Sequence, residues 1–275
     1  MCKVLKVTRS AYYSWLEKSE GKPRQDVLSE RVESMYFECK QRYGSPRLAV
    51  ELRKSGVSIS RTTVAKKLKA KGLRARSHRR FKVSTTDSKH NKAVSPNLLD
   101  RNFDTDARGK VWVSDITYIH TKEGFLYLTV IVDLYDRKVV GWSLSDGMST
   151  DETVLPAWYM ALGNRNAQEG LVFHSDRGVQ YASEAFRNAL AAKKAVQSMS
   201  GKGDCWDNAV AESFFKSLKV EAIYGFQLKD KECMKSEVFD YIEVWYNRKR
   251  RHSYIGFQTI LEKEIADGLH LFNAA

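Results

Sequence analysis

The chain has 275 residues, of which 43% are hydrophobic, and a formal net charge of +13, so it is long enough for two domains that each bury a core. Its longest apolar run, residues 125–132, falls well short of the roughly 20 residues that a membrane-spanning helix needs. Four widely separated cysteines without a CxxC pair exclude a cysteine-rich zinc fold and indicate a reduced, intracellular protein.

The charge is unevenly distributed along the chain. Residues 1–100 carry 24 Lys and Arg against 9 Asp and Glu, a balance of +15, whereas residues 101–275 carry 22 against 24, a balance of −2. A basic segment joined to a near-neutral one indicates a module that grips a polyanion, attached to a domain with a different role. A protein that is merely basic would spread the excess charge over its whole length.

The basic part is predicted to be all-α. Residues 26–42 place apolar side chains at helical spacing. Ser45 is predicted to cap a second helix, which Gly56 ends, and Ser60 is predicted to cap a third. Two short helices around a glycine turn, the second of them rich in lysine, are typical of a helix-turn-helix.

The helix after Ser60 is the expected DNA-reading element. Val64 and Leu68 are four residues apart and are expected to face inward. A lysine-rich surface that only meets solvent is the alternative explanation, but the agreement of turn chemistry with charge favours DNA. The basic stretch 74–86 that follows indicates phosphate contacts. The DNA-binding candidates in this part of the chain are Arg61, Thr62, Lys66, Lys67, Arg79 and Arg80.

From about residue 110 the pattern changes to that of a mixed α/β domain. Three consecutive strands joined by short turns, beginning with residues 111–120, are predicted to form an antiparallel meander. Helices and strands then alternate, which predicts a mixed sheet flanked by helices. The later elements are expected as helix 150–164 capped by Thr150 or Asp151, strand 171–175, helix 183–194, strand 196–200, helix 206–223 and a long amphipathic helix 230–249.

Three acidic residues occupy positions where a carboxylate needs an explanation. Asp115 lies inside the first strand, where burying a charge without a partner is costly. Asp176 follows the fourth strand, which is expected beside the first, although an aspartate here could instead cap the next helix. Glu212 lies on a polar helix face that is expected to point away from the core, and on its own it is explained by a surface pair with lysine. The other members of this polar face are Asn208, Lys216 and Lys219.

Four motifs, WVSDITYI, FHSDRGVQY, SMSGKGDCWDNAVAESFFKSLK and YNRKRRHSYIGF, occur in this order along the chain. Together they resemble the second-frame transposases of a large group of bacterial insertion sequences, which are similar to retroviral integrases. The resemblance runs from VTRSAYYSWL near the N-terminus to about Glu264. The 35 residues between Asp176 and Glu212 match the D,D-35-E spacing of this family, and Lys219, seven positions after Glu212, matches its basic position.

The resemblance implies a ribonuclease-H-like core in which Asp115, Asp176 and Glu212 are catalytic residues and metal ligands. The implied cofactor is Mg²⁺, two ions per active site, with Mn²⁺ as an alternative. The implied partners are double-stranded DNA at the element's ends and at the target, further copies of the same chain, and a fusion partner from an upstream reading frame; no membrane is implied. The implied location is the bacterial cytoplasm, at the nucleoid.

Further DNA contacts are expected on the core. Lys216 and Lys219 follow Glu212 on its helix, and Arg248 and Arg250 belong to the basic cluster 247–252. Cations at the C-terminal end of a helix also stabilise the helix through its dipole. For that cluster, DNA contact and helix capping therefore explain the sequence equally well. Two rival functions are a nonspecific nuclease of the ribonuclease H type and a DNA-binding regulator with a degenerate core, and the intact acidic trio argues against the second.

The expected organisation of the chain has five parts. They are an N-terminal helical segment (1–25), a helix-turn-helix DNA-binding region (26–86), a linker (87–105), a ribonuclease-H-like integrase catalytic core (106–229) and a C-terminal helical extension of the core (230–275). The expected fold class is α/β, a ribonuclease-H-like mixed sheet with flanking helices, preceded by an all-α helix-turn-helix region. The expected function is that of a transposase that binds the terminal inverted repeats of an insertion sequence and catalyses Mg²⁺-dependent strand cleavage and strand transfer.

Overall fold

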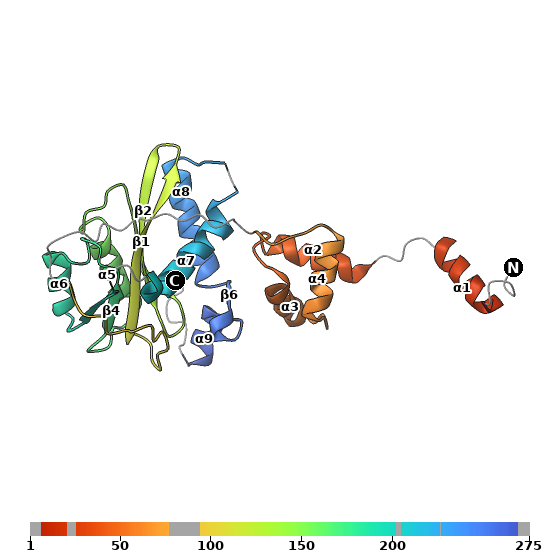
Figure 1. Cartoon of the computed structure of the whole chain (residues 1–275), viewed down its shortest axis with the longest axis horizontal. Coiled ribbons are helices and arrows are strands. Elements are labelled where there is room, and N and C mark those ends of the chain that lie inside the picture. Colours follow the sequence, from red (N-terminus) through yellow and green to blue (C-terminus); the bar gives the residue numbers. More distant parts are fainter. Residues whose placement is uncertain (1–6, 21–25, 77–93, 202–204, 226, 269–275) are drawn as a thin grey trace. The chain divides into compact units, whose positions relative to one another are not determined.

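The computed structural model describes residues 7–20, 26–76, 94–201, 205–225 and 227–268. The chain divides into two compact units, Met1–Ala75 and Arg76–Ala275 (Figure 1). Arg79 and Arg80, which are expected to contact phosphates, lie outside the described residues. None of the described helices is both long enough and apolar enough to cross a lipid bilayer.

The regular secondary structure in the described residues of the first unit is all helical. Ser60 caps the last helix as predicted, because its Oγ accepts a hydrogen bond from the Thr63 N–H at 3.1 Å. The prediction for Ser45 is wrong: it is the first residue of its helix, Gly44 is the N-cap, and no side chain caps this end. Pro46 in the first turn has no N–H to satisfy, which reduces the need for a cap. The helices are α1 (Arg9–Glu20), α2 (Val27–Glu38), α3 (Ser45–Lys54) and α4 (Arg61–Ala70).

Helices α2, α3 and α4 pack around a small apolar core. Val64 and Leu68 of α4 are both buried, which confirms that they face inward. The Tyr36 hydroxyl donates a 2.7 Å hydrogen bond to the Arg74 carbonyl and so ties α2 to the segment that follows α4. Gly56 has a φ of +86°, a left-handed conformation that suits the glycine turn between α3 and α4. The predicted pair of short helices around a glycine turn is therefore present.

The second unit is built on a five-stranded mixed sheet in the order β3-β2-β1-β4-β5. Strands β1, β2 and β3 pair antiparallel, as the predicted meander requires, whereas β4 pairs parallel with both β1 and β5. The predicted mixed sheet and the predicted place of the fourth strand beside the first are confirmed. The strands are β1 (Val111–Thr121), β2 (Gly124–Asp133), β3 (Val139–Ser145), β4 (Val172–Ser175) and β5 (Val196–Met199).

Helices cover both faces of this sheet, with α5 (Val154–Asn164) and α6 (Glu184–Ala191) on one side and α7 (Ala209–Leu218) on the other (Figure 1). The core between the sheet and the first two of these helices is largely aromatic and includes the buried side chains of Trp112 and Trp158. Helix α7 packs on β1 and β2. Strand β1 is therefore covered on both faces, and any charged residue on it needs a partner.

The helices of the second unit differ from the predictions in three places. Neither Thr150 nor Asp151 caps α5; its N-cap is Thr153, whose hydroxyl donates instead to the Ser149 carbonyl at 2.6 Å. The predicted helix 206–223 is divided into the 3₁₀ turn η1 (Cys205–Asn208), α7 and the π-helical segment η2 (Lys219–Ile223). The predicted helix 230–249 is divided into α8 (Lys231–Phe239) and a second π-helical segment, η3 (Asp240–Tyr246). The remaining elements are β6 (Arg251–His252), η4 (Ser253–Ile255), β7 (Gln258–Thr259) and α9 (Ile260–Ala266).

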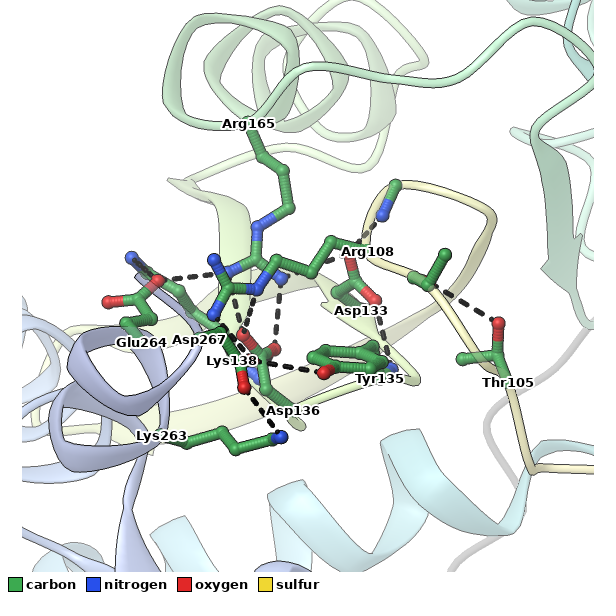
Figure 2. A network of polar contacts seen from close by, with 12 residues as sticks. Thr105, Arg108, Asp133, Tyr135, Asp136, Lys138, Arg165, Lys263, Glu264 and Asp267 are labelled. Carbon is green, nitrogen blue, oxygen red and sulfur yellow. Dashed lines mark hydrogen bonds and ion pairs between the residues drawn. The ribbon is translucent and has the colours of Figure 1, made fainter. Parts of the chain in front are cut away.

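A buried network of ion pairs joins α9 to the sheet (Figure 2). Asp133 and Asp136, at the turn between β2 and β3, are fully buried. The guanidinium of Arg165, at the end of α5, lies 3.0 Å from Asp133 Oδ2 and 2.8 Å from Asp136 Oδ2. The same group reaches Glu264 Oε1 of α9 at 3.0 Å. The C-terminal helix is thus attached to the core through charges that water barely reaches.

Replacing Arg165 by alanine is expected to lower the free energy of unfolding by about 3–5 kcal/mol, because three carboxylates lose their shared buried partner. Urea unfolding followed by tryptophan fluorescence measures this change. As a control, Lys194→Ala breaks a pair with Glu169 in which the side chains are 72% and 75% exposed, and little change in stability is expected. Equal stabilities of the wild type and Arg165→Ala would contradict the role given to the network.

Candidate active site

Asp115 lies in the middle of β1, on the face of the sheet that α7 covers. Side chains alternate along a strand, so Asp115 shares its face with Thr117, and Ser114 points to the other face. The contacts agree: Thr117 Oγ1 accepts a 2.7 Å hydrogen bond from Lys219, which follows α7. The Ser114 hydroxyl lies 2.8 Å from that of Tyr181, a member of the aromatic core. Asp115 itself is half-buried.

Asp176 immediately follows β4, the parallel neighbour of β1. The register pairs Val113 with His174, so continuing both chains by two residues brings Asp176 level with Asp115. Asp176 does not cap the next helix, because Ser183 is the N-cap of α6. The helix-cap explanation of Asp176 is therefore excluded.

The turn after Asp176 accounts for the glycine at position 178. The Gly178 N–H donates a 2.9 Å hydrogen bond to Asp176 Oδ1. A Cβ at this position would lie 3.0 Å from the same oxygen and 3.2 Å from Gln180 Oε1. A larger residue would push against the carboxylate, so the glycine turn helps to fix where it lies.

The polar face of α7 contacts β1 at both of its ends. Asn208, directly before α7, is buried and donates from Nδ2 to the Ser114 carbonyl at 2.8 Å. Lys219, directly after α7, contacts Thr117. These two contacts fall on either side of Asp115, so the middle of the polar face lies opposite that residue.

Glu212 occupies the middle of this polar face, between the two contacts with β1. The prediction that the whole face points away from the core is wrong for Asn208 and Lys219, because both contact the sheet. Glu212 and Lys216 are exposed, as predicted. Hydrophobic periodicity assigns every polar residue to the solvent side, whereas here Asn208 and Lys219 face the sheet.

The charges of Asp176 and Glu212 act on Asp115. Burial raises the pKa of Asp115 well above its usual range, and the charges of Asp176 and Glu212 raise it further. A 2.8 Å hydrogen bond from the Ile116 N–H and the charge of Lys219 act in the opposite direction. Because screening weakens such interactions with distance, these effects indicate that Asp176 and Glu212 each lie close enough to Asp115 to act on its carboxyl group.

The pKa values of Glu212 and Lys219 are also shifted by their surroundings. Burial of its carboxyl end raises the pKa of Glu212, even though much of the side chain is exposed. Burial lowers the pKa of the Lys219 ammonium, and attraction to Asp115 opposes this effect. Three acids and one ammonium leave the site with an excess of negative charge, which attracts cations.

The site has the donor chemistry of a divalent-cation site without a closed coordination geometry. Carboxylate oxygens are the ligands that Mg²⁺ prefers, and a cation would relieve their repulsion. As the side chains stand, no three His, Cys, Asp or Glu residues in the described part of the chain form a group that could hold a metal ion. Asp115 and Asp176 each direct one oxygen to a backbone N–H instead. The residues fit a divalent cation chemically and would have to close around it.

The sequence-based predictions missed Asp207, a buried carboxylate directly before Asn208. It accepts hydrogen bonds from Arg101 Nε at 2.8 Å, Asn97 Nδ2 at 3.0 Å and the Gly201 N–H at 2.8 Å. Burial would raise the pKa of Asp207, but the hydrogen bonds from Arg101 and Gly201, together with the charge of Arg101, outweigh it and the pKa is lowered. Asp207 therefore fastens η1, and with it the start of α7, to the segment that contains Asn97 and Arg101. An Asp-Asn pair before a helix also fits simple capping, so the sequence carries no distinct signal for this role.

The DNA-binding candidates on α4 divide into exposed and paired side chains. Lys67 donates to Asp26 Oδ2 at 2.6 Å and to Ser29 Oγ at 3.1 Å, and its side chain is only 17% exposed. Since Asp26 is the N-cap of α2, Lys67 ties α4 to the start of α2. DNA contact stays a prediction for the exposed candidates, which are Arg61, Thr62 and Lys66.

The basic cluster 247–252 on the core is mostly buried. Arg250 is 7% exposed, and its Nη2 donates to Glu221 Oε1 at 3.0 Å. This burial argues against the predicted contact between Arg250 and DNA. Lys216 and Arg248 are exposed, and for them DNA contact stays a prediction.

Comparison with known proteins gives matches over almost the whole chain. The family described as "Integrase core domain" matches residues 105–205 and 212–259, and the family described as "HTH-like domain" matches residues 23–81. Transposase InsF for insertion sequence IS3A from Escherichia coli K12 is 42% identical over 260 residues, which cover 93% of this chain and 90% of the relative. A 31 kDa protein of insertion element IS600 from Shigella sonnei is 38% identical over 258 residues, which cover 93% and 94%.

The solved structures that match are more distant. The catalytic core domain of BIV integrase has a TM-score of 0.43 and 17% identity, and the match covers 58% of this chain and 96% of that one. The HTLV-2 integrase catalytic core domain in complex with magnesium has a TM-score of 0.39 and 14% identity, with 56% and 94% covered.

Replacing Asp115 by asparagine is expected to stabilise the protein when divalent cations are removed with EDTA, because the change relieves repulsion and keeps an oxygen that can accept from the Ile116 N–H. The melting temperature should rise by a few degrees, which corresponds to on the order of 1 kcal/mol for a domain of this size. Differential scanning calorimetry measures the shift. The same change at the exposed Asp151 is the control, and a lower melting temperature for Asp115→Asn would count against convergence.

Proposed function

The chain belongs to the family of insertion-sequence transposases, and from this premise we propose that Asp115, Asp176 and Glu212 are the catalytic residues with which it cleaves and joins DNA. Three observations support the proposal: β4 pairs with β1 just before Asp176 and Asp115, α7 contacts β1 on either side of Asp115, and the charges of Asp176 and Glu212 raise the pKa of Asp115. Packing alone offers no compensation for such repulsion, whereas bound cations do.

The proposed reaction is metal-dependent phosphodiester transfer. When bound, two divalent ions, Mg²⁺ or alternatively Mn²⁺, would activate the attacking oxygen and stabilise the leaving oxygen. Asp115, Asp176 and Glu212 would hold the ions, with Asp115 as the ligand that both ions share. No side chain would serve as nucleophile: water would first hydrolyse a phosphodiester and free a 3′-hydroxyl at the element's end. That hydroxyl would then attack a phosphodiester of another strand, from which the strand's own 3′-oxygen would leave. Lys219 would offset phosphate charge beside the trio.

The first unit is proposed to read the terminal inverted repeats of the element. Its exposed basic helix α4 has the capped start and the inward apolar face of a recognition helix. Residues 1–75 carry 18 Lys and Arg against 7 Asp and Glu, and this excess of +11 supports phosphate contacts. The proposed DNA contacts are Arg61, Thr62 and Lys66 on α4, Arg79 and Arg80 after it, and Lys216, Lys219 and Arg248 on the core.

The proposed partners follow from the same reaction. Joining both ends of an element to a target requires double-stranded DNA and more than one active site, so further copies of this chain are proposed to assemble on the DNA. A fusion partner from an upstream reading frame, and a location at the nucleoid in the bacterial cytoplasm, belong to the same proposal. A nonspecific nuclease would cut without joining, and a regulator would bind without cutting.

Removing one ligand charge at a time tests the catalytic assignment. Asp115→Asn, Asp176→Asn and Glu212→Gln are each expected to slow Mg²⁺-dependent joining of a pre-cut 3′-hydroxyl end by at least roughly 100-fold, because several kcal/mol of transition-state stabilisation is lost. A strand-transfer assay with labelled DNA measures the rate, and filter binding should show unchanged DNA affinity. Asp151→Asn, the same change at an exposed site, should join normally. Wild-type joining by any of the three variants would remove that residue from the trio.

The two neighbouring lysines of α4 form a matched pair for testing DNA recognition. Lys66→Ala is expected to weaken binding to the element's ends and to reduce the slope of log affinity against log salt by about 1, because one phosphate contact is lost. Lys67→Ala should leave the slope closer to that of the wild type, because Lys67 pairs with Asp26. Fluorescence anisotropy at several salt concentrations measures both, and identical slopes for wild type and Lys66→Ala would contradict the recognition role.

A further inference from the structure

Helix α7 does not end after its polar face but continues into the π-helical segment η2. Lys219 is the first residue of this segment, and its carbonyl accepts a 2.6 Å hydrogen bond from the Tyr224 N–H, five residues on. The same residue places its ammonium 2.7 Å from Thr117 Oγ1 and near Asp115. The residue that closes the π turn is thus also the residue that brings a positive charge to the acidic trio.

The π turn is supported from behind by Glu221. This buried carboxylate accepts hydrogen bonds from the Tyr241 hydroxyl at 3.1 Å and from Trp245 Nε1 at 3.0 Å. Both donors belong to η3, the second π-helical segment. The guanidinium of Arg250 adds bonds from Nε at 3.1 Å and from Nη2 at 3.0 Å. Glu221 therefore connects η2 to η3 and to the start of β6 by directional contacts.

Arg250 extends this support to α7 itself. Its Nη2 also donates to Ser217 Oγ at 3.0 Å, so one guanidinium holds the last turn of α7 and the π turn together. At about 100° per residue, a position nine residues after Glu212 lies roughly half a turn away from it around the helix. The helical rod thus has Glu212 and Lys219 on the side of β1 and Glu221 on the opposite side, where η3 and Arg250 hold it.

We propose that Glu221 is a positioning residue that acts through Lys219: by stabilising the π turn, it holds the Lys219 ammonium at Thr117, beside the carboxylates. The inference rests on the proposed function, since Lys219 matters to the reaction only if the trio performs it. Loss of the Glu221 charge removes the partner of Arg250 and the support of the π turn. The helix can then relax toward regular α geometry, which changes where the Lys219 side chain leaves the backbone.

A double-mutant cycle on strand transfer tests this dependence. Glu221→Gln is expected to slow joining about tenfold in the wild-type background but less than about twofold in the Lys219→Ala background, because residues that act through one another are not additive. Equal slowing in both backgrounds, no slowing by Glu221→Gln, or wild-type joining by Lys219→Ala would each overturn the proposal. If Glu221→Gln does not fold, Tyr241→Phe, which removes one hydrogen bond to Glu221, is measured in its place and should show a smaller effect of the same pattern.

A matched control separates positioning from stability. Glu264→Gln removes a carboxylate from another largely buried ion-pair network, at Arg165 and Lys138, far along the chain from α7. It should lower the melting temperature as Glu221→Gln does, yet leave the joining rate of the folded protein unchanged. Slowing of the reaction by Glu264→Gln to the same extent would show that lost stability alone explains the effect.

The crystal structure of the Glu221→Gln variant distinguishes failure of this inference from failure of the proposed function. The Lys219 ammonium is expected to leave Thr117 Oγ1, which lies 2.7 Å away in the wild type. If the contact is unchanged, Glu221 does not position Lys219, whatever the joining assay shows. If the contact is lost while the wild-type protein joins no DNA, the positioning claim holds and the proposed function is the one that fails.

Discussion

Repulsion of Asp115 by Asp176 and Glu212 is the constraint that the rest of the second unit has to satisfy. Asp115 lies on β1, and Asp176 directly follows β4, the parallel neighbour of β1. The third comes from a helix that must be held against the sheet despite like charges on both sides. Contacts from Asn208 and Lys219 to β1 hold that helix at its two ends, and the same Lys219 lowers the electrostatic cost at Asp115. The core therefore holds α7 against β1 although Glu212 and Asp115 carry like charges.

Charge is used differently in the two units. The second unit is near neutral and places many of its charges in buried pairs, such as Arg165 with Asp136 and Arg250 with Glu221. Arg165 also pairs with Glu264 of α9, and the Arg250–Glu221 pair joins the residue before β6 to η2, so these contacts attach described segments after α7 to the rest of the second unit. The first unit carries the excess positive charge, and on α4 much of it stays exposed. The contrast suits a chain in which one unit binds DNA by its phosphates and the other performs chemistry on it.

Local patterns in the sequence predicted the strands and their order in the sheet. Strand alternation and topology rules located the five-stranded sheet and placed the strand of Asp176 beside that of Asp115. Side-chain partners far away in sequence were not predictable: Lys67 pairs with Asp26, 41 residues earlier, and Arg250 pairs with Glu221, 29 residues earlier. From the sequence alone, Lys67 and Arg250 are expected to be exposed, because charged side chains usually are. The π-helical segments were missed for a similar reason, since hydrophobic periodicity does not report a turn that distant buried bonds stabilise.

Anomalous diffraction from crystals grown with Mn²⁺ tests the central claim most directly, because it locates cations independently of any enzymatic assay. The account predicts manganese peaks bounded by carboxylate oxygens of Asp115, Asp176 and Glu212, with Asp115 in contact with each ion. Crystals that take up no manganese at this place, or that bind it away from Asp115, would contradict the account.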